Sequence, residues 1–436
     1  MKKTHFLMLS SLLLNVWGSA AVEVDLGGKD SPESPAHAMG TVRKTGCNPT
    51  HPRVAKAFES SVAKKIAPMP DERISVGVLK SFEARLSAYQ GGLAAAQAVS
   101  KGAAPKAPKA PKAPKAPPLI QLLAVEAWPT DFVYDQESLG SCTANSMAFI
   151  LRYLSVRNSK NPYNFLANPA RLDISRLYQY FNTRYYEGVL IGSDQISSDV
   201  GASMAGSILA LDKYGCTPEV FSESLESVFG CRFAYGGWPY NIDEFATQPS
   251  PESYRRAFDP DYDGLNAGVG FAPSDSRVNQ YSVVSKNIRY ADLIPSKYLK
   301  FGKVLTSAEK KAIVSSFVTA LSKSQPIYFG TAIDASFFND QQGFVPTPNL
   351  SRFSPIGGHA IVLVGYGPYN SSNPSKNYFK FINSWGSNWG QGGFGFFEEE
   401  YVANVNVFWS EAFAVDLPKS APSLYSGDFC LHAQSR

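Results

Sequence analysis

Histidine is scarce in this sequence. Five histidines occur in 436 residues, and only His359 and His432 follow residue 118. They form no His-x-x-x-His pair, so neither a structural nor a catalytic zinc site is expected, and we expect no metal or other cofactor. His432 lies close to the end of the chain. Imidazole chemistry in this part of the protein would therefore depend on His359.

Long hydrophobic runs are also missing. The most apolar stretch, residues 6–16, is too short to span a bilayer. Lys2 and Lys3 precede it and small residues at 18–21 follow it, which is the pattern of a secretory signal peptide over residues 1–21. The alternative is an ordinary buried N-terminal helix. We expect an exported, soluble protein, extracellular or periplasmic, without a membrane span.

Basic residues are unevenly distributed. Residues 1–118 carry a net charge of +9 and residues 119–436 a net charge of −5. This asymmetry favours two parts of the chain that attract each other. Residues 119–436 contain no basic stripe interleaved with aromatic residues, so nucleic acid is not an expected partner.

The chain divides at a repetitive segment. "GAAPKAPKAPKAPKAPP", residues 102–118, predicts an extended linker, which could be a cleavage site or an uncut spacer. Before it lies a leader, residues 22–101, with helices expected at 54–66 and 78–99. After it lies the body, residues 119–436, with a helical pattern after Cys142 and β-prone runs in "HAIVLVGYG", "NYFKFINSWG" and "GGFGFFEEEYV". This order predicts an α+β body of two lobes, with residues 239–304 as a loop-rich elaboration.

Only five cysteines are present, which leaves one thiol over if the others pair, as is common in exported proteins. If Cys142 is the unpaired one, we expect a Cys216–Cys231 disulfide because these residues are close in sequence. By elimination, Cys47 would then pair with Cys430 and tie the leader to the body.

Cys142 lies at an expected helix start, where the helix dipole favours a thiolate. His359, between two glycines and a strand, is the candidate imidazole partner. Asn383 can orient the ring through its side-chain oxygen, and Trp385 can shield that hydrogen bond from water. Gln136 and the Cys142 backbone N–H can donate to an oxyanion. These residues together predict nucleophilic catalysis by a thiol.

Four segments carry a resemblance to a known family. They are "VYDQESLGSCTANSMAF", "SSDVGASMAGSILALDKYGCTPE", "GGHAIVLVGYG" and "NYFKFINSWGSNWGQGGFGFF". Over residues 119–417 the chain resembles the papain-like (C1) cysteine peptidases, specifically the bacterial-type branch. The resemblance implies a papain-like fold with a helical lobe, a strand-rich barrel-like lobe and a helical pro-region. It assigns Cys142 as nucleophile, His359 as base, Asn383 as orienter and Gln136 as oxyanion donor.

The resemblance also implies a substrate pocket. Gly201, Met204 and Ala360 match positions that shape the pocket for the second residue before the cut, and their character suggests an apolar preference. The chain departs from the family at Glu137, where the branch has glycine, and at Gly358. The acidic Glu137 could raise the pKa of Cys142 or point to solvent. His359 follows Cys142 by 217 residues, against about 130–150 in the compact signature, and residues 239–304 could hold the excess.

A calcium loop is a separate possibility. "DPDYDGLNAG" places Asp259, Asp261 and Asp263 at alternate positions before Gly264, but the glutamate expected later is replaced by Gly270. Such a segment can bind calcium or form an acidic turn, and the sequence leaves both readings open.

The sequence therefore predicts a secreted, monomeric zymogen of a cysteine endopeptidase. Its partners would be protein or peptide substrates, with the propeptide as an intramolecular inhibitor. Two alternatives remain open: an acyltransferase that uses the same three residues, and a catalytically inactive exported binding module.

Overall fold

The computed structural model describes part of the chain in detail. The described residues are 45–62, 120–121, 133–158, 174–217, 219, 237–258, 287–299, 303–339, 343–350, 353–368 and 376–417. Four features predicted from the sequence lie outside the described residues. They are the signal peptide, the helix at 78–99, the linker and the candidate calcium loop.

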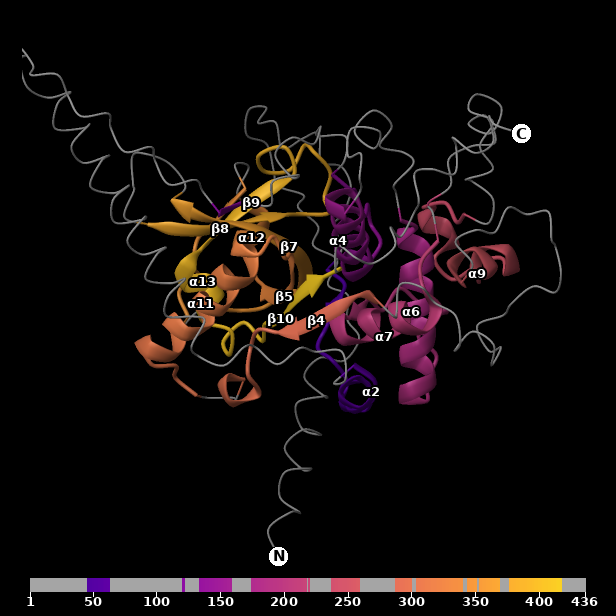
Figure 1. The fold of residues 1–436 in the computed structure, drawn as a ribbon, viewed down its shortest axis with the longest axis horizontal. Helices are drawn as coiled ribbons and strands as arrows, with labels where there is room; N and C mark the ends of the chain where they lie inside the picture. Colours follow the sequence, from indigo (N-terminus) through magenta and orange to yellow (C-terminus); the bar gives the residue numbers. More distant parts are fainter. Residues whose placement is uncertain are drawn as a thin grey trace, which may run out of the picture.

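The body has a helical part beside a strand-rich part (Figure 1). The helical part contains α4 (Cys142–Asn158), α6 (Arg176–Ile191), α7 (Met204–Tyr214), α9 (Pro251–Phe258) and the 3-10 turn η5 (Ile242–Glu244). The strand-rich part also carries α11 (Ser307–Ser322), α12 (Ser336–Asn339), α13 (Glu399–Ala403) and η7 (Ser296–Tyr298). The α+β organisation in two parts agrees with the sequence prediction.

The main sheet runs in the order β4-β10-β5-β7-β8-β9-β6, and β2 pairs with β7 outside this path. Its strands are β2 (Ile120–Gln121), β4 (Arg289–Asp292), β5 (Ile327–Ile333), β6 (Phe344–Val345), β7 (Gly357–Pro368), β8 (Asn377–Ile382), β9 (Phe394–Glu398) and β10 (Glu411–Asp416). The antiparallel pairing of β5 with β7 places Thr331 opposite His359. β7 is buried along almost its whole length, which explains its nearly continuous apolar sequence.

Local sequence signals account for the helix ends. Thr306 and Glu309 form a reciprocal capping box at the start of α11. Ser175 accepts from the Tyr178 N–H at the start of α6, and Gly192, with φ of 80°, ends that helix in the left-handed region. The helical pattern predicted after Cys142 forms α4, which packs on β7, and one hydrophobic cluster joins the two parts.

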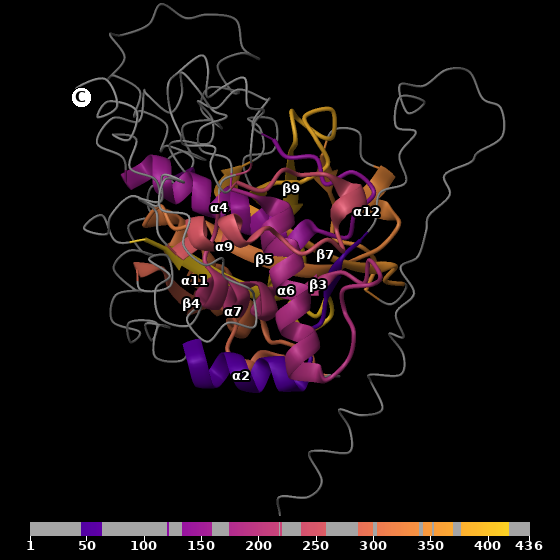
Figure 2. The ribbon, with the colours of Figure 1, turned by 90° about the vertical axis from the view of Figure 1, so that its right-hand side faces the viewer.

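The described part of the leader packs into the body. It forms β1 (Cys47–Asn48), which pairs in parallel with β3 (Ala202–Ser203), and α2 (Pro52–Val62), which packs against α7 and α6. In Figure 1 this indigo segment passes between the two parts of the body, and Figure 2 shows α2 beneath α7. Val54 and Phe58 are buried, and the ring centroid of Phe58 lies 5.4 Å from that of Phe413. The leader is therefore part of the folded core.

One expectation needs correction. The expected Cys47–Cys430 disulfide is wrong, because Cys47 is a buried free thiol whose side chain faces Gly330 and Met204. The described part of residues 239–304 includes α9 and β4, and β4 extends the sheet along β10. Cys231 lies outside the described residues, so the Cys216–Cys231 pairing stays a prediction.

The other elements match their predictions where they are described. The helix expected at 54–66 is present as α2 up to residue 62, and the three β-prone runs form β7, β8 and β9. Within the described part of the chain, every helix is too short or too polar to cross a membrane.

Candidate active site

Cys142 is the first residue of α4 and is fully buried. The backbone N–H groups of Ala360, Gly46 and Thr143 face its sulfur and favour the thiolate. Ala360 directly follows His359 on β7. The start of α4 and the middle of the sheet therefore meet at the sulfur, and the structure brings the predicted nucleophile and the predicted base to one place.

The imidazole of His359 is oriented by Asn383. Its Nε2 lies 2.8 Å from the Asn383 side-chain oxygen, which also accepts the Ser384 backbone N–H at 2.8 Å. Because this oxygen is an acceptor, Nε2 carries the proton and donates it. Among the residues that the structure describes, Nδ1 of His359 has no hydrogen-bond partner. This nitrogen is the one available to exchange a proton with a thiol.

Aromatic rings enclose the hydrogen bond between His359 and Asn383. The Trp385 ring stacks on the imidazole with centroids 4.8 Å apart, and Phe337 meets it edge-on at 5.5 Å. Trp385 and Phe337 are both fully buried. The predicted shielding role of Trp385 fits this position, and Phe337 is a second shield that the sequence motifs did not single out.

Burial sets the protonation states in this covered form. It raises the pKa of Cys142 to about 11, to which the charge of Asp199 contributes, although the three backbone N–H groups oppose the shift. Burial also lowers the pKa of His359 to about 4, partly offset by its bond to Asn383. At neutral pH the covered site therefore holds a neutral thiol and a neutral imidazole.

Gln136 is held by contacts at both ends of its side chain. Its amide oxygen accepts from the Ser384 hydroxyl at 2.6 Å, and its NH2 group donates to the Leu139 carbonyl at 2.9 Å. Its backbone N–H donates to the Ser384 carbonyl at 2.8 Å. The predicted oxyanion donor is thus anchored to the residue beside Asn383.

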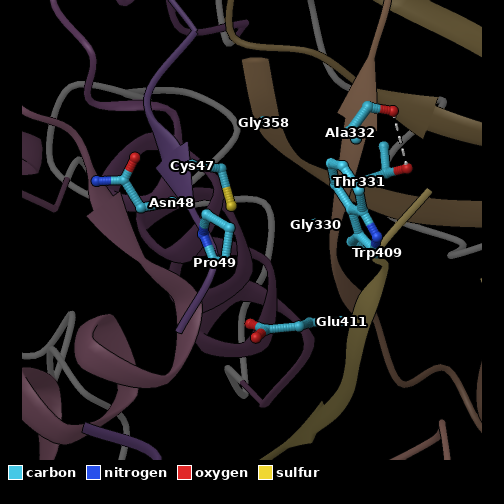
Figure 3. Close-up of a pocket in the computed structure, with 9 residues that line it drawn as sticks. All are labelled: Cys47, Asn48, Pro49, Gly330, Thr331, Ala332, Gly358, Trp409 and Glu411. Carbon is cyan, nitrogen blue, oxygen red and sulfur yellow. Dashed lines mark hydrogen bonds between the residues drawn. The ribbon is translucent and has the colours of Figure 1, made fainter. Parts of the chain in front are cut away.

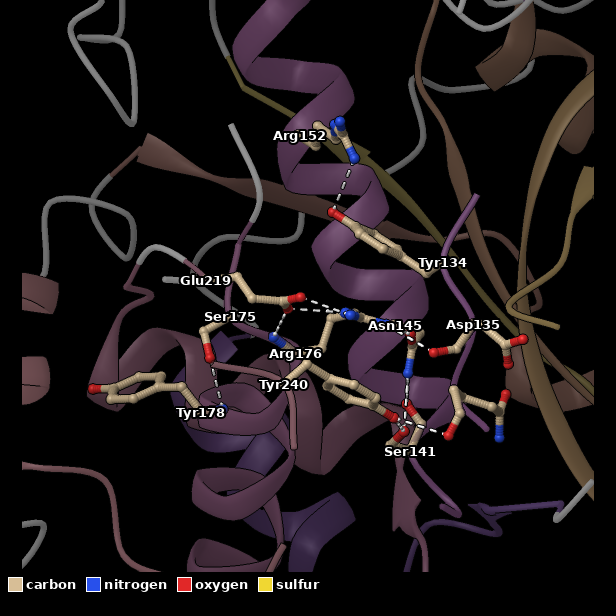
Figure 4. A network of polar contacts seen from close by, with 11 residues as sticks. Tyr134, Asp135, Ser141, Asn145, Arg152, Ser175, Arg176, Tyr178, Glu219 and Tyr240 are labelled. Carbon is tan, nitrogen blue, oxygen red and sulfur yellow. Dashed lines mark hydrogen bonds and ion pairs between the residues drawn. The ribbon is translucent and has the colours of Figure 1, made fainter. Parts of the chain in front are cut away.

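A buried polar network supports the turn that carries Gln136 (Figure 4). The Arg176 guanidinium pairs with Glu219 at 2.6 Å and lies 3.7 Å from the centre of the Tyr240 ring. Arg176 donates to the Asp135 carbonyl at 3.0 Å, and the Tyr240 hydroxyl donates to the Gln136 carbonyl at 3.0 Å. Sequence reasoning missed Arg176 and Tyr240 because neither lies in a motif, and the contact of Tyr240 with Gln136 spans 104 positions.

Glu137 has a conformation that explains the glycine usual at this position in the family. Its φ is 54°, in the left-handed region, and its side chain is exposed. Of the two readings of Glu137, the structure supports the solvent-facing one, because Asp199 is the acid whose charge acts on Cys142.

Glycine at this position should stabilise the protein. A side chain in the left-handed region costs roughly 1–2 kcal/mol, and the greater freedom of glycine in the unfolded chain offsets about half of that. Glu137→Gly should therefore raise the free energy of unfolding by about 0.5–1 kcal/mol, measured by denaturant unfolding of the full chain. Glu137→Ala keeps the Cβ atom and should give no such gain. Equal stabilisation by both variants would instead assign the effect to the carboxylate.

The leader covers this site. The Ala202 N–H donates to the Gly46 carbonyl at 2.7 Å. A Cβ atom on Gly201 would lie 2.3 Å from that same oxygen, and one on Gly358 would lie 1.9 Å from the Cys47 carbonyl oxygen. Only glycine permits this approach at either position. Gly201, Met204 and Ala360, the three expected pocket residues, are therefore brought together around the segment that contains Gly46 and Cys47.

Metal binding has no support in the described residues, which contain no group of three or more His, Cys, Asp or Glu side chains suited to hold an ion. The candidate calcium ligands lie outside them, so that possibility stays a prediction.

Comparison with known proteins finds similarity to one protein family. Residues 283–410 match the model for the papain family cysteine protease. An uncharacterized peptidase C1-like protein of Acanthamoeba polyphaga mimivirus is 27% identical over 281 residues, which cover 63% of this chain and 68% of the relative. Silicatein of Petrosia ficiformis is 40% identical over 83 residues, or 18% of this chain and 22% of the relative. Among solved structures, xylellain, a cysteine protease from Xylella fastidiosa, is 23% identical with a TM-score of 0.40, over 69% of this chain and 87% of its own. Over residues 283–410 the chain is therefore similar to the papain-family cysteine proteases.

Proposed function

We propose that this chain is the zymogen of an exported, monomeric cysteine endopeptidase whose nucleophile is Cys142. The observation that carries the proposal is the meeting of Cys142, at the start of α4, with the His359–Ala360 segment of β7. Asn383 lies on the far side of the imidazole, where it can hold the proton on Nε2. Export rests on the predicted signal peptide at residues 1–21.

The proposed reaction follows from these positions. The Cys142 thiolate attacks a peptide carbonyl, and the resulting oxyanion receives hydrogen bonds from the Gln136 NH2 group and the Cys142 backbone N–H. His359 then gives the proton on Nδ1 to the leaving amine, and an acyl-enzyme remains. Water loses a proton to His359, attacks the thioester and releases the acid, which regenerates the thiol group.

The leader supplies the proposed inhibition. The segment around Gly46 lies against Cys142 and Gly201, so a substrate cannot reach the sulfur while this segment is in place. The opposite charges of the basic leader and the acidic body favour this association. Cutting in the Lys-Ala-Pro linker, followed by departure of the leader, would open the site.

The test begins with the full chain, cut in the linker by trypsin, with the leader removed by gel filtration and the body verified by mass spectrometry. This form should hydrolyse fluorogenic peptides, and a thiol-directed epoxide should alkylate its Cys142 side chain. Cys142→Ala, prepared in the same way, should retain less than about 1% of the turnover. Absence of both hydrolysis and labelling would support an inactive binding module. Labelling with transfer to an added amine, in place of hydrolysis, would indicate an acyltransferase.

A further inference from the structure

The two proposed oxyanion donors lie at the two ends of one short turn. Gln136 supplies its side-chain NH2 group, and the backbone N–H of Cys142 belongs to the peptide that follows Ser141. Within the turn, the Leu139 N–H donates to the Gln136 carbonyl at 3.2 Å, and the Ser141 N–H donates to the Leu139 carbonyl at 2.8 Å. Glu137 is held in the left-handed region, which is unfavourable for a residue with a Cβ atom. The turn therefore needs support from other elements if the two donors are to keep a fixed distance.

The Tyr240 hydroxyl connects the two ends of this turn (Figure 4). It donates to the Gln136 carbonyl at 3.0 Å and lies 2.8 Å from the Ser141 hydroxyl. A phenol has one proton, so in the second bond the Ser141 hydroxyl donates to the Tyr240 oxygen. Burial raises the pKa of Tyr240 to about 12, although the Arg176 charge opposes the shift, so the phenol keeps its proton at neutral pH. One hydroxyl group thus joins the residue that carries the first donor to the residue beside the second.

Ser141 is held in turn by Asn145, in the first turn of α4. The Asn145 NH2 group donates to the Ser141 hydroxyl oxygen at 2.9 Å and to the Ser141 carbonyl at 3.0 Å. Arg176 donates to the Asn145 side-chain oxygen at 3.1 Å, which fixes the orientation of the amide. The bonds therefore form one directed chain that begins at the guanidinium and ends at the Gln136 carbonyl. Hydrogen bonds that share a direction polarise one another, and the charge at the start strengthens the chain.

The start of this chain is a buried ion pair. Glu219 accepts from Arg176 Nε at 2.9 Å and from Arg176 Nη2 at 2.6 Å, one bond to each carboxylate oxygen. Such a bidentate pair has a fixed geometry. The guanidinium carbon lies 3.7 Å from the centre of the Tyr240 ring and 4.6 Å from that of the Tyr134 ring. The ion pair therefore fixes the position of the Tyr240 ring and, with it, the position of the hydroxyl.

We propose that Tyr240 is a positioning residue whose hydroxyl sets the distance between the Gln136 NH2 group and the Cys142 backbone N–H. The proposal rests on the proposed peptidase function, because both donors act on the oxyanion of that reaction. Such donors must lie about 2.7–3.1 Å from the oxyanion, and an error of about 1 Å in position can cost about 100-fold in rate. These bonds form in the transition state, so loss of the Tyr240 hydroxyl should lower kcat and leave KM nearly unchanged.

The test compares Tyr240→Phe with the unsubstituted enzyme, each prepared as the full chain cut in the linker and freed of its leader. Phenylalanine keeps the ring on the Arg176 guanidinium and removes only the hydroxyl. We expect kcat for a fluorogenic peptide to fall by about 10- to 100-fold, less than the loss of a whole oxyanion donor causes, while KM changes less than about threefold. Alkylation of Cys142 by iodoacetamide forms no tetrahedral oxyanion, so its rate should change less than about twofold.

Tyr254→Phe is the matched control. The Tyr254 hydroxyl also donates a buried hydrogen bond in the helical part, to the Asn182 side-chain oxygen at 2.8 Å, and this bond lies outside the turn at residues 136–141. Both variants lose a buried hydroxyl and a similar amount of stability. The kcat of Tyr254→Phe should change less than about twofold. A loss equal to that of Tyr240→Phe would overturn the proposal, because the effect would then belong to any buried hydroxyl.

A double-mutant comparison separates positioning from a structural role. In a Gln136→Ala background one of the two donors is absent, so their spacing no longer matters. Tyr240→Phe should then lower kcat by less than about threefold. A structural role would give the same loss in both backgrounds. Equal losses in the two backgrounds would overturn the proposal, and so would an unchanged kcat in a folded Tyr240→Phe variant.

Ser141→Ala provides a second variant if Tyr240→Phe fails to fold. It removes the Ser141 side of the connection and leaves the Tyr240 ring and Arg176 in place. Its kcat should fall by at least about tenfold with KM nearly unchanged. A Ser141→Ala enzyme with the parent kcat would overturn the proposal.

Failure of this inference is distinct from failure of the proposed function. If the unsubstituted enzyme hydrolyses peptides through Cys142 and Tyr240→Phe is equally active, only the inference is overturned. An unsubstituted enzyme that cleaves no peptide and leaves Cys142 unlabelled overturns both.

Discussion

Gly46→Ala should activate the full-length protein without any cut in the linker. A Cβ atom at this position would lie 1.9 Å from the Gly140 carbonyl oxygen, well inside the contact limit for two backbone segments. The leader strand must therefore move away, and it loses the hydrogen bond that the Ala202 N–H donates to Gly46. The clash and the lost hydrogen bond together should reduce the free energy that holds the leader over the site by roughly 3 kcal/mol. The fraction of molecules with an uncovered site should therefore rise by about 100-fold. The measurement is the initial rate of peptide hydrolysis by the intact chain.

The matched control changes the neighbouring leader strand residue. The Asn48 side chain donates to the Val200 carbonyl at the exposed rim of the contact. Asn48→Ala removes one such bond and creates no clash, so its rate should rise by less than about tenfold. Gels run before and after each assay establish that the chain stays uncut. If uncut Gly46→Ala hydrolyses peptide no faster than the unsubstituted chain, then the leader does not block the site in the manner proposed.

Departure of the leader should also create an ion pair that the covered protein lacks. With the pKa of Cys142 raised to about 11, only about one thiol in 10⁴ is ionised at pH 7. The pKa of His359 is lowered to about 4 by the same burial. When water enters, both shifts shrink, and a thiolate beside an imidazolium becomes the favoured state. The thiolate fraction at pH 7 should rise by a factor of 10³ or more.

The thiolate can be counted by its ultraviolet absorbance, as the difference between each form and its Cys142→Ala counterpart. The full chain should show no Cys142 thiolate until the pH exceeds about 9, since ionisation of a thiol with a raised pKa appears only as the pH approaches that value. The chain freed of its leader should show about one thiolate at pH 7. His359→Ala, freed in the same way, should lose it. If the Cys142 thiol titrates along the same curve in the full chain and in the chain freed of its leader, then the leader does not inhibit the site by suppressing the thiolate.

The sequence predicted the proposed catalytic residues better than it predicted their surroundings. Cys142, His359 and Asn383 lie in short motifs whose residue types have few alternative uses, and the helix and strands that carry them have clear periodicity. Glu411 has no such motif. It lines a cavity together with Cys47 of the leader (Figure 3) because it lies opposite Gly330, and that register depends on the whole sheet. The same limit applies to Tyr240, which contacts Gln136 across 104 positions.

The incorrect disulfide has a different origin. Pairing Cys47 with Cys430 used only a count of cysteines, and a count contains no information about distance. In the structure Cys47 belongs to the strand that covers the nucleophile, where a free thiol fills the space over Gly330. The apolar substrate preference inferred from Gly201, Met204 and Ala360 stays a prediction.

The burial of Val54 and Phe58 has a consequence for the timing of activation. These side chains share a hydrophobic cluster with the apolar face of α4, and fully burying a side chain of either type is worth about 1.5–3 kcal/mol. A protease that nicks the chain breaks a covalent connection but leaves this packing intact. Separation of the leader from the body must expose this hydrophobic surface to water. We therefore expect the separation to be slower than the cleavage of the linker. The protein would then stay inactive for some time after the linker is cut, until the leader separates from the body. During this delay the protein could diffuse away from the place where it was cut.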